Sequence, residues 1–132
     1  MTFTFKKTVA VLLVAIAAAM SAYAREANPR AALVEVSRNT LPKEAQQTLA
    51  AIEKSGPFAY PKDGVTFGNR ERVLPAKARG FYREYTVKTP GERTRGARRI
   101  VCGGNQDGAQ THSTEPCYYS DDHYATFARI KS

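Results

Sequence analysis

The first 24 residues determine how much of this 132-residue chain is available to form a domain. Lys6 and Lys7 precede an apolar run from Val9 to Ala19, and Ala22-Tyr23-Ala24 supplies the small residues that a signal peptidase requires. This pattern predicts a signal peptide over residues 1–24. Its removal would leave 108 of the 132 residues, which suffices for one small domain with a single core.

An uncleaved membrane anchor is the alternative interpretation of this segment. The apolar run is short and rich in alanine, whereas a membrane-spanning helix needs about 20 apolar residues. In either case we expect the domain to lie outside the cytoplasm, secreted or periplasmic. After cleavage of the predicted signal peptide it would be free of the membrane.

Cys102 and Cys117 are the two cysteines of the chain. Because an exported domain meets an oxidising compartment, we expect one disulfide that closes a short loop and stabilises the fold by about 3 kcal/mol. Two free thiols remain the alternative, since sequence does not show how closely two Cα atoms approach. The chain has no Cys-x-x-Cys pair and His112 stands alone in a polar stretch, so we expect no metal and no cofactor.

Basic residues outnumber acidic ones. The whole chain has a formal net charge of +8, and loss of Lys6 and Lys7 would leave 18 basic against 12 acidic residues, or +6. A positive excess favours a polyanionic partner such as nucleic acid. Many exported proteins are basic for other reasons, so the charge alone does not decide the function.

Periodicity predicts one helix near the start of the domain. The helix begins at Leu41, with Pro42 in its first turn, and ends before Gly56-Pro57. Residues 25–40 precede it as an N-terminal arm, in which 33–36 form either a short strand or a docked segment; residues 41–132 make up the main domain. The apolar face of the helix is formed at i, i+4 and i+7 spacing by Ala45, Leu49 and Ile52.

Three runs rich in β-branched and aromatic residues follow a long loop over Phe58–Pro75. They are Phe81–Lys88, Arg98–Gly103 and His123–Ile130, and turn-forming residues separate them. We expect the last two to form a hairpin with the cysteines near its base. One helix followed by an antiparallel sheet is an α+β domain.

Side-chain alternation divides the first of these strands into two faces. One face suits packing against the helix, and the other is polar with Glu84 at its centre. The helix-facing residues are Phe81, Tyr85 and Val87, and the polar-face residues are Tyr82, Glu84 and Thr86.

Short motifs from Leu41 to Ile130 carry a family resemblance. They include Leu41-Pro42-Lys43-Glu44-Ala45, Gly56-Pro57-Phe58, Phe67-Gly68-Asn69-Arg70-Glu71, Tyr82-Arg83-Glu84-Tyr85-Thr86-Val87, Arg93-Thr94-Arg95-Gly96, Arg98-Arg99-Ile100 and Asp122-His123-Tyr124-Ala125-Thr126-Phe127. In this order they resemble the microbial guanyl-specific ribonucleases, small secreted enzymes related to barnase. The resemblance implies the microbial ribonuclease fold, with one N-terminal helix packed on an antiparallel sheet, and a monomeric endoribonuclease that needs no metal.

The resemblance also implies roles for five residues in cleavage of single-stranded RNA. Glu84 falls on the general base and His123 on the general acid, which act on the 2′-hydroxyl and on the departing 5′-oxygen. Arg95 and Arg99 fall on the phosphate-binding arginines, whose forked guanidinium groups suit a charged phosphorane. Tyr124 falls on the tyrosine beside the scissile phosphate.

Guanine preference is implied through Phe67, Asn69, Arg70 and Glu71. A carboxylate at Glu71 can accept hydrogen bonds from the ring N–H and the exocyclic amino group of guanine, which adenine does not present together. Phe67 would stack on the base, or else serve as a core aromatic.

Two departures and one competing function accompany the resemblance. Gly68 stands where related sequences often carry a polar residue, and the stretch from Gly103 to Pro116 looks longer than in relatives. A basic RNA-binding protein without turnover is the competing interpretation, although such a protein would have little reason to keep the base, the acid and both arginines. The family also makes a barstar-like inhibitor plausible, presenting acidic groups to the same basic cleft.

Overall fold

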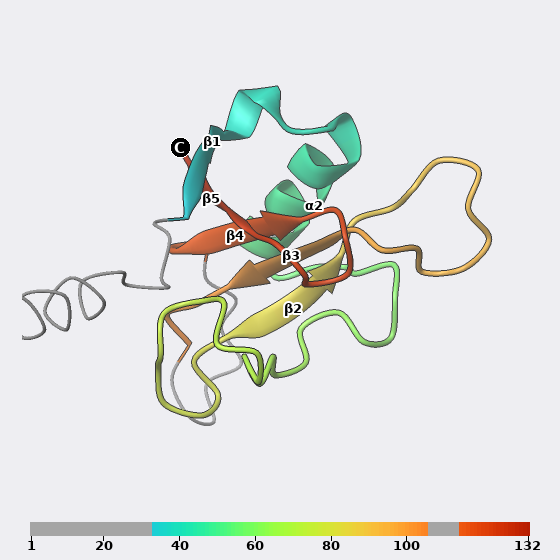
Figure 1. Cartoon of the computed structure of the whole chain (residues 1–132). Coiled ribbons are helices and arrows are strands. Elements are labelled where there is room, and N and C mark those ends of the chain that lie inside the picture. Colours follow the sequence, from blue (N-terminus) through green and yellow to red (C-terminus); the bar gives the residue numbers. More distant parts are fainter. Residues whose placement is uncertain (1–32, 106–113) are drawn as a thin grey trace, which may run out of the picture. The chain divides into compact units, whose positions relative to one another are not determined.

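The computed structural model describes residues 33–105 and 114–132. The predicted signal peptide (1–24), the start of the predicted arm (25–32) and His112 lie outside the described residues. None of the helices in the described ranges is long and apolar enough to cross a membrane. The elements follow in the order β1 (Val34–Ser37), the 3-10 helix η1 (Arg38–Thr40), α2 (Lys43–Glu53), β2 (Arg83–Thr86), β3 (Arg99–Cys102), β4 (Cys117–Ser120) and β5 (Ala128–Lys131) (Figure 1).

The five strands form one sheet in the order β1-β5-β4-β3-β2, with α2 packed against one of its faces (Figure 1). This confirms the predicted α+β architecture. Neighbouring strands from β2 to β5 are antiparallel, whereas β1 pairs in parallel with β5, so the sheet is mixed. Residues 34–37 are therefore a strand rather than a docked segment.

The predicted hairpin of the last two runs is wrong, because an unpredicted strand lies between them. β3 pairs with β4, in a register that sets Cys102 opposite Cys117, and β4 in turn pairs with β5. The four residues of β4 follow a stretch rich in turn-forming residues, which concealed this short strand. Cys102 and Cys117 form a disulfide, as expected.

The helix is positioned by its predicted apolar face. Pro42 is the N-cap, and the buried side chains of Ala45, Leu49 and Ile52 pack against the sheet residues Tyr85, Val87 and Ile100. The chain leaves the helix through Ser55 and Gly56, which have positive φ values of 58° and 101°. Ser55 N–H donates to the carbonyl of Ile52 at 3.0 Å and Gly56 N–H donates to that of Ala51 at 2.8 Å, which is the pattern of a Schellman motif with Ser55 in the left-handed position.

The opposite face of the sheet carries a second apolar cluster, so the prediction that this face is polar is wrong in part. Leu74, from the loop between α2 and β2, supplies an apolar partner for the buried sheet residues on this face. Phe81 packs with this cluster instead of facing the helix, because β2 begins only at Arg83 and strand alternation does not extend back to it. The buried members of the cluster are Leu74, Tyr82, Val101, Tyr118 and Phe127.

Candidate active site

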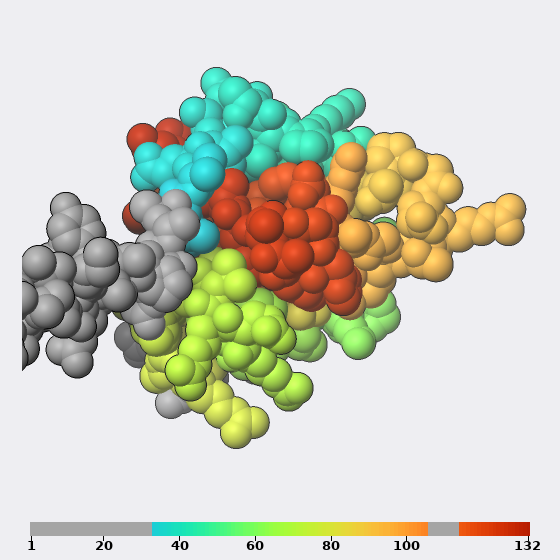
Figure 2. Space-filling view, viewed as in Figure 1, coloured from blue at the N-terminus to red at the C-terminus, as the bar shows by residue number. Residues whose placement is uncertain are grey.

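A cleft of about 970 Å³ opens on the sheet face that α2 leaves free. Its walls come from the loop over residues 66–80, from β2 and from the turn that precedes β5. In Figure 2 the C-terminal segment, in red, lies at the middle of the visible face, with the yellow-green segment directly below it. Three parts of the chain that are distant in sequence thus meet at one surface.

Glu84 projects from β2 into this cleft, and its side chain is only 14% exposed. Arg95 Nη2 donates to Glu84 Oε1 at 3.0 Å, and the hydroxyl of Tyr124 donates to Glu84 Oε2 at 2.8 Å. Each carboxylate oxygen therefore has a donor, and the group is held in one orientation.

Arg95 and Arg99 are not among the residues that line the cleft, but each bonds to a residue that does. Arg95 Nε donates to Thr86 Oγ1 at 3.0 Å, which fixes the plane of its guanidinium beside Glu84. Arg99 is buried in β3 with 2% of its surface exposed, and its Nε donates to the hydroxyl of Tyr124 at 3.1 Å. Two cations thus stand beside the carboxylate and the phenol, where an anionic group in the cleft would gain from their charge.

Tyr124 links Arg99 to Glu84 through its hydroxyl, which accepts from the first and donates to the second. Burial and the hydrogen bond to Glu84 raise the pKa of Tyr124 to about 12. The phenol therefore stays protonated at neutral pH and remains a donor to Glu84.

His123 lies in the turn before β5 and lines the cleft. Its predicted position at the start of a strand is wrong, because β5 begins at Ala128 and both His123 and Tyr124 have positive φ values, 55° and 72°. His123 N–H donates to the carbonyl of Ala97 at 3.0 Å, which ties this turn to the loop that carries Arg95.

Asp122 shapes the turn that holds His123, a role that the sequence analysis missed. Its Oδ1 accepts from Ser120 Oγ at 2.8 Å and from Thr126 N–H at 2.9 Å, and its Oδ2 accepts from Thr126 Oγ1 at 2.5 Å. Ser120 Oγ also accepts from Tyr124 N–H at 3.0 Å. These bonds, those to Thr126 foremost, lower the pKa of Asp122. The available signal was the aspartate itself, a residue type whose side chain often accepts hydrogen bonds in turns.

The loop over residues 67–71 is closed by the side chain of Asn69. Its amide donates to the carbonyl of Leu74 at 2.9 Å and accepts from Leu74 N–H at 3.1 Å, while Asn69 itself has a positive φ of 51°. Phe67 stacks on Tyr124 with ring centroids 5.0 Å apart. Glu71 is exposed on the cleft and makes no hydrogen bond to any described residue, so its carboxylate is available to a ligand.

Comparison with known proteins matches residues 24–131 to a family model described as ribonuclease. Guanyl-specific ribonuclease Sa of Kitasatospora aureofaciens is 52% identical over 95 residues, which are 72% of this chain and 91% of that protein. Guanyl-specific ribonuclease St of Saccharopolyspora erythraea is 51% identical over 87 residues, 66% of this chain and 77% of that protein. This chain belongs to the microbial guanyl-specific ribonuclease family.

Solved structures of a family member, ribonuclease Sa2, agree in fold. The structure with guanosine-2′-cyclophosphate is 50% identical and aligns with a TM-score of 0.66, covering 76% of this chain and 97% of that one. A second, with 3′-GMP, is 48% identical with a TM-score of 0.64 and covers 75% of this chain and 97% of that one.

This member of the family brings most of its expected site residues to one cleft. Arg95 is connected to the cleft by its bond to Glu84, and Arg99 by its bond to Tyr124. Lys77 and Arg79 also line the cleft, although the sequence analysis did not single them out. Within residues 33–105 and 114–132, no group of three His, Cys, Asp or Glu side chains could hold a metal ion. The expected residues that line the cleft are Phe67, Asn69, Arg70, Glu71, Glu84, His123 and Tyr124.

Proposed function

We propose that this protein cleaves single-stranded RNA after guanosine, first by transesterification to a 2′,3′-cyclic phosphate and then by hydrolysis. The observation that carries the proposal is that Glu84 and His123 line one cleft, with Tyr124 and Arg95 bonded to the two oxygens of the glutamate. Relatives about 50% identical bear the name guanyl-specific ribonuclease, and the Sa2 structures contain guanine nucleotides.

In the first step Glu84 takes the proton of the 2′-hydroxyl. The 2′-oxygen then bonds to phosphorus, the bond from phosphorus to the 5′-oxygen breaks, and His123 gives its proton to that departing oxygen. The products are an RNA end with a 2′,3′-cyclic phosphate and a second RNA with a free 5′-hydroxyl.

The second step opens the ring with water and exchanges the two roles. His123, now neutral, takes a proton from water, the water oxygen bonds to phosphorus, and the bond from phosphorus to the 2′-oxygen breaks. Glu84 returns its proton to that oxygen, which leaves a 3′-phosphate and restores both groups.

Arg95 and Arg99 act on the phosphate during both steps. The pentavalent phosphorane gathers negative charge on its equatorial oxygens, and preorganised guanidinium groups stabilise that charge. The bonds from Arg95 to Thr86 and from Arg99 to Tyr124 hold both groups in place before the substrate arrives. Little reorganisation is then needed in the transition state.

Under this proposal, guanine is held by Glu71 along one edge and by the stacked pair of Phe67 and Tyr124 on one face. Glu71 is exposed and accepts from the two adjacent donors of the base, while the loop closed by Asn69 presents backbone N–H groups to its carbonyl oxygen. Phe67 is half-buried and stacked on Tyr124, so it serves both packing and the binding surface.

The test is cleavage of the dinucleotide GpU in EDTA by the wild type and by Glu84→Gln and His123→Ala variants. Loss of proton transfer should lower kcat by about 10²- to 10⁴-fold in each. Lys54→Gln, on the exposed end of α2, is the matched surface control. An intact substrate with the wild type, or full activity in either site variant, contradicts the proposal.

We further infer that the mature protein is an exported monomer and that its producer holds a barstar-like inhibitor. The family match begins at residue 24, where the predicted signal peptide ends, and the chain carries a disulfide. Mass spectrometry of the extracytoplasmic fraction should find a chain that begins near Arg25. A chain retained with residues 1–24 attached contradicts export by cleavage.

A further inference from the structure

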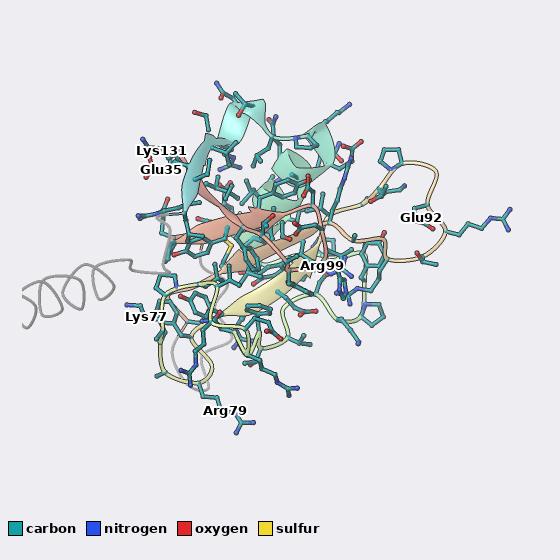
Figure 3. All side chains as sticks on the ribbon, viewed as in Figure 1. Glu35, Lys77, Arg79, Glu92, Arg99 and Lys131 are labelled. Atoms are coloured by element: carbon teal, nitrogen blue, oxygen red, sulfur yellow. A yellow bond between two sulfur atoms is a disulfide. The ribbon has the colours of Figure 1, made fainter. Side chains whose placement is uncertain are left out.

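The four residues expected to recognise guanine all lie within residues 67–75, here called the base loop: Phe67, Asn69, Arg70 and Glu71. The chain returns from this loop to β2 through a segment that Figure 3 marks with Lys77 and Arg79, on the opposite side of β2 from α2 in this view. The base loop contains no helix or strand, so its shape depends on individual hydrogen bonds.

Glu71 lies in a turn of the base loop that its neighbours close. Arg72 N–H donates to the carbonyl of Asn69 at 3.0 Å, which places Arg70 and Glu71 at the two central positions of the turn. The side chain of Asn69 joins this turn to Leu74 by two further bonds. The position of the Glu71 carboxylate therefore depends on where the Leu74 end of the loop is held.

Tyr82, which follows the returning segment, bonds to both ends of the base loop. Its carbonyl accepts from Phe67 N–H at 2.9 Å, and its hydroxyl donates to the carbonyl of Pro75 at 2.6 Å. Pro75 follows Leu74 directly in the sequence. One residue thus ties the start of the loop to its end, and the tie at the end is made by the side-chain hydroxyl.

The ring of Tyr82 is itself fixed. Only 3% of Tyr82 is exposed, and its ring packs edge-on to Phe81 and Tyr118, with centroids 4.9 and 6.3 Å away. The backbone of Phe81 is anchored in turn, because Asn105 donates to its carbonyl from both its N–H and its Nδ2, each at 3.2 Å. Burial raises the pKa of Tyr82 to about 12, so the hydroxyl stays protonated at neutral pH and remains a donor to Pro75.

Building on the proposed function, we propose that Tyr82 is a positioning residue for guanine, whose hydroxyl holds the base loop, through Pro75, in the conformation in which Glu71 meets the base. Tyr82 takes no part in proton transfer, which belongs to Glu84 and His123. Without its hydroxyl the loop samples other conformations, and the affinity for guanine falls with the fraction of molecules that keep the competent one. Recognition of the base is lost while binding of a bare phosphate is spared.

The experiment measures the Kd of 3′-GMP and of inorganic phosphate by calorimetry for the wild type, Tyr82→Phe and Tyr118→Phe. Tyr82→Phe removes only the hydroxyl, and the Kd of 3′-GMP should rise by about five- to tenfold, as for one lost hydrogen bond. The Kd of phosphate should stay within about twofold, because the bonds that hold Arg95 and Arg99 do not involve the base loop. Tyr118→Phe removes a hydroxyl from the same apolar cluster and should keep both wild-type values.

Kinetics should show the same division between the base and the reaction. For GpU, Tyr82→Phe should raise KM and leave kcat within about twofold, and the ratio of kcat/KM for GpU to that for ApU should fall by about five- to tenfold.

Pro75→Gly is a second variant that leaves the buried cluster intact, because Pro75 is exposed. It loosens the backbone beside the accepting carbonyl and should raise the Kd of 3′-GMP by about two- to threefold. This variant decides the question if Tyr82→Phe does not fold.

An unchanged Kd for 3′-GMP in Tyr82→Phe, or in Pro75→Gly where the first variant is unfolded, overturns the role of Tyr82. An equal loss for 3′-GMP and phosphate overturns it too, because the whole cleft would then be disturbed, as does an equal loss in Tyr118→Phe. If the wild type binds 3′-GMP but leaves GpU intact, the proposed function fails while the binding comparison still tests Tyr82.

Discussion

Tyr124 and Glu84 are joined by a 2.8 Å hydrogen bond from the phenol to the carboxylate, across 40 residues of sequence. The same phenol accepts from Arg99, so a buried cation, a tyrosine and the proposed general base form one chain. The turn before β5, the middle of β2 and the start of β3 must all be in place to assemble it.

Removing the hydroxyl of Tyr124 should therefore weaken catalysis more than substrate binding. In Tyr124→Phe, Glu84 loses one of its two donors and Arg99 loses an acceptor. We expect kcat for GpU to fall by about 30-fold, equivalent to about 2 kcal/mol, with a smaller change in KM. Tyr119→Phe, on the helix side of the sheet, is the matched control. A kcat within about twofold of wild type would exclude this role.

Glu71 should determine the choice of base. In Glu71→Gln the amide keeps one acceptor but turns a donor toward a donor of guanine, so the base loses a pairing and meets a mismatch. The ratio of kcat/KM for GpU to that for ApU should drop by about 10- to 100-fold. Glu92→Gln alters a carboxylate outside the cleft and should keep the wild-type ratio. If Glu71→Gln retains full guanine preference, another group recognises the base.

Local signals in the sequence predicted the helix and the sites of three strands. Ala45, Leu49 and Ile52 repeat at helical spacing and are all buried, so periodicity was sufficient for α2. β4 was missed because four residues after a polar stretch carry too little pattern of their own. Its position depends on pairing with β3, an interaction between distant segments that local patterns do not reveal.

The family motifs predicted the residues of the candidate site, but they did not predict how neighbouring side chains hold those residues in position. The motif containing His123 predicts the start of a strand, but Asp122 turns the chain there with hydrogen bonds to Ser120 and Thr126. Likewise, Asn69 uses its side chain to close the loop on Leu74. Such roles depend on partners whose proximity exists only in the folded chain.

The turn that carries His123 should lose stability in acid. Hydrogen bonds to Thr126 and Ser120 lower the pKa of Asp122 below its ordinary value of 3.8. The stabilisation is therefore complete above that value and is lost as the pH falls through the lowered pKa. Asp122→Asn should reduce Tm at about pH 6, and its difference from wild type should shrink toward about pH 3.

Asp121→Asn tests whether this effect belongs to Asp122 alone. Asp121 is the neighbouring exposed carboxylate and forms no hydrogen bond with a described side chain, so its variant should follow the wild type at both pH values. Thermal unfolding followed by circular dichroism measures each Tm. A difference between Asp122→Asn and wild type that grows in acid would contradict the assignment.

The disulfide should contribute stability without taking part in the chemistry. Cys102 and Cys117 are buried on the helix side of the sheet, whereas the cleft lies on the other face. Opening a loop with a sequence separation of 15 should cost about 3 kcal/mol on the chain-entropy model, or roughly 12–24 °C in Tm.

Cys102→Ala/Cys117→Ala and the wild type in excess dithiothreitol should melt at similar temperatures, both below the oxidised protein. Well below that transition, the double variant should still cleave GpU, since neither sulfur touches Glu84 or His123. A wild type whose Tm does not respond to reductant would refute the stabilising role. Loss of GpU cleavage in a folded double variant would show that the disulfide-linked ends of β3 and β4 also shape the cleft.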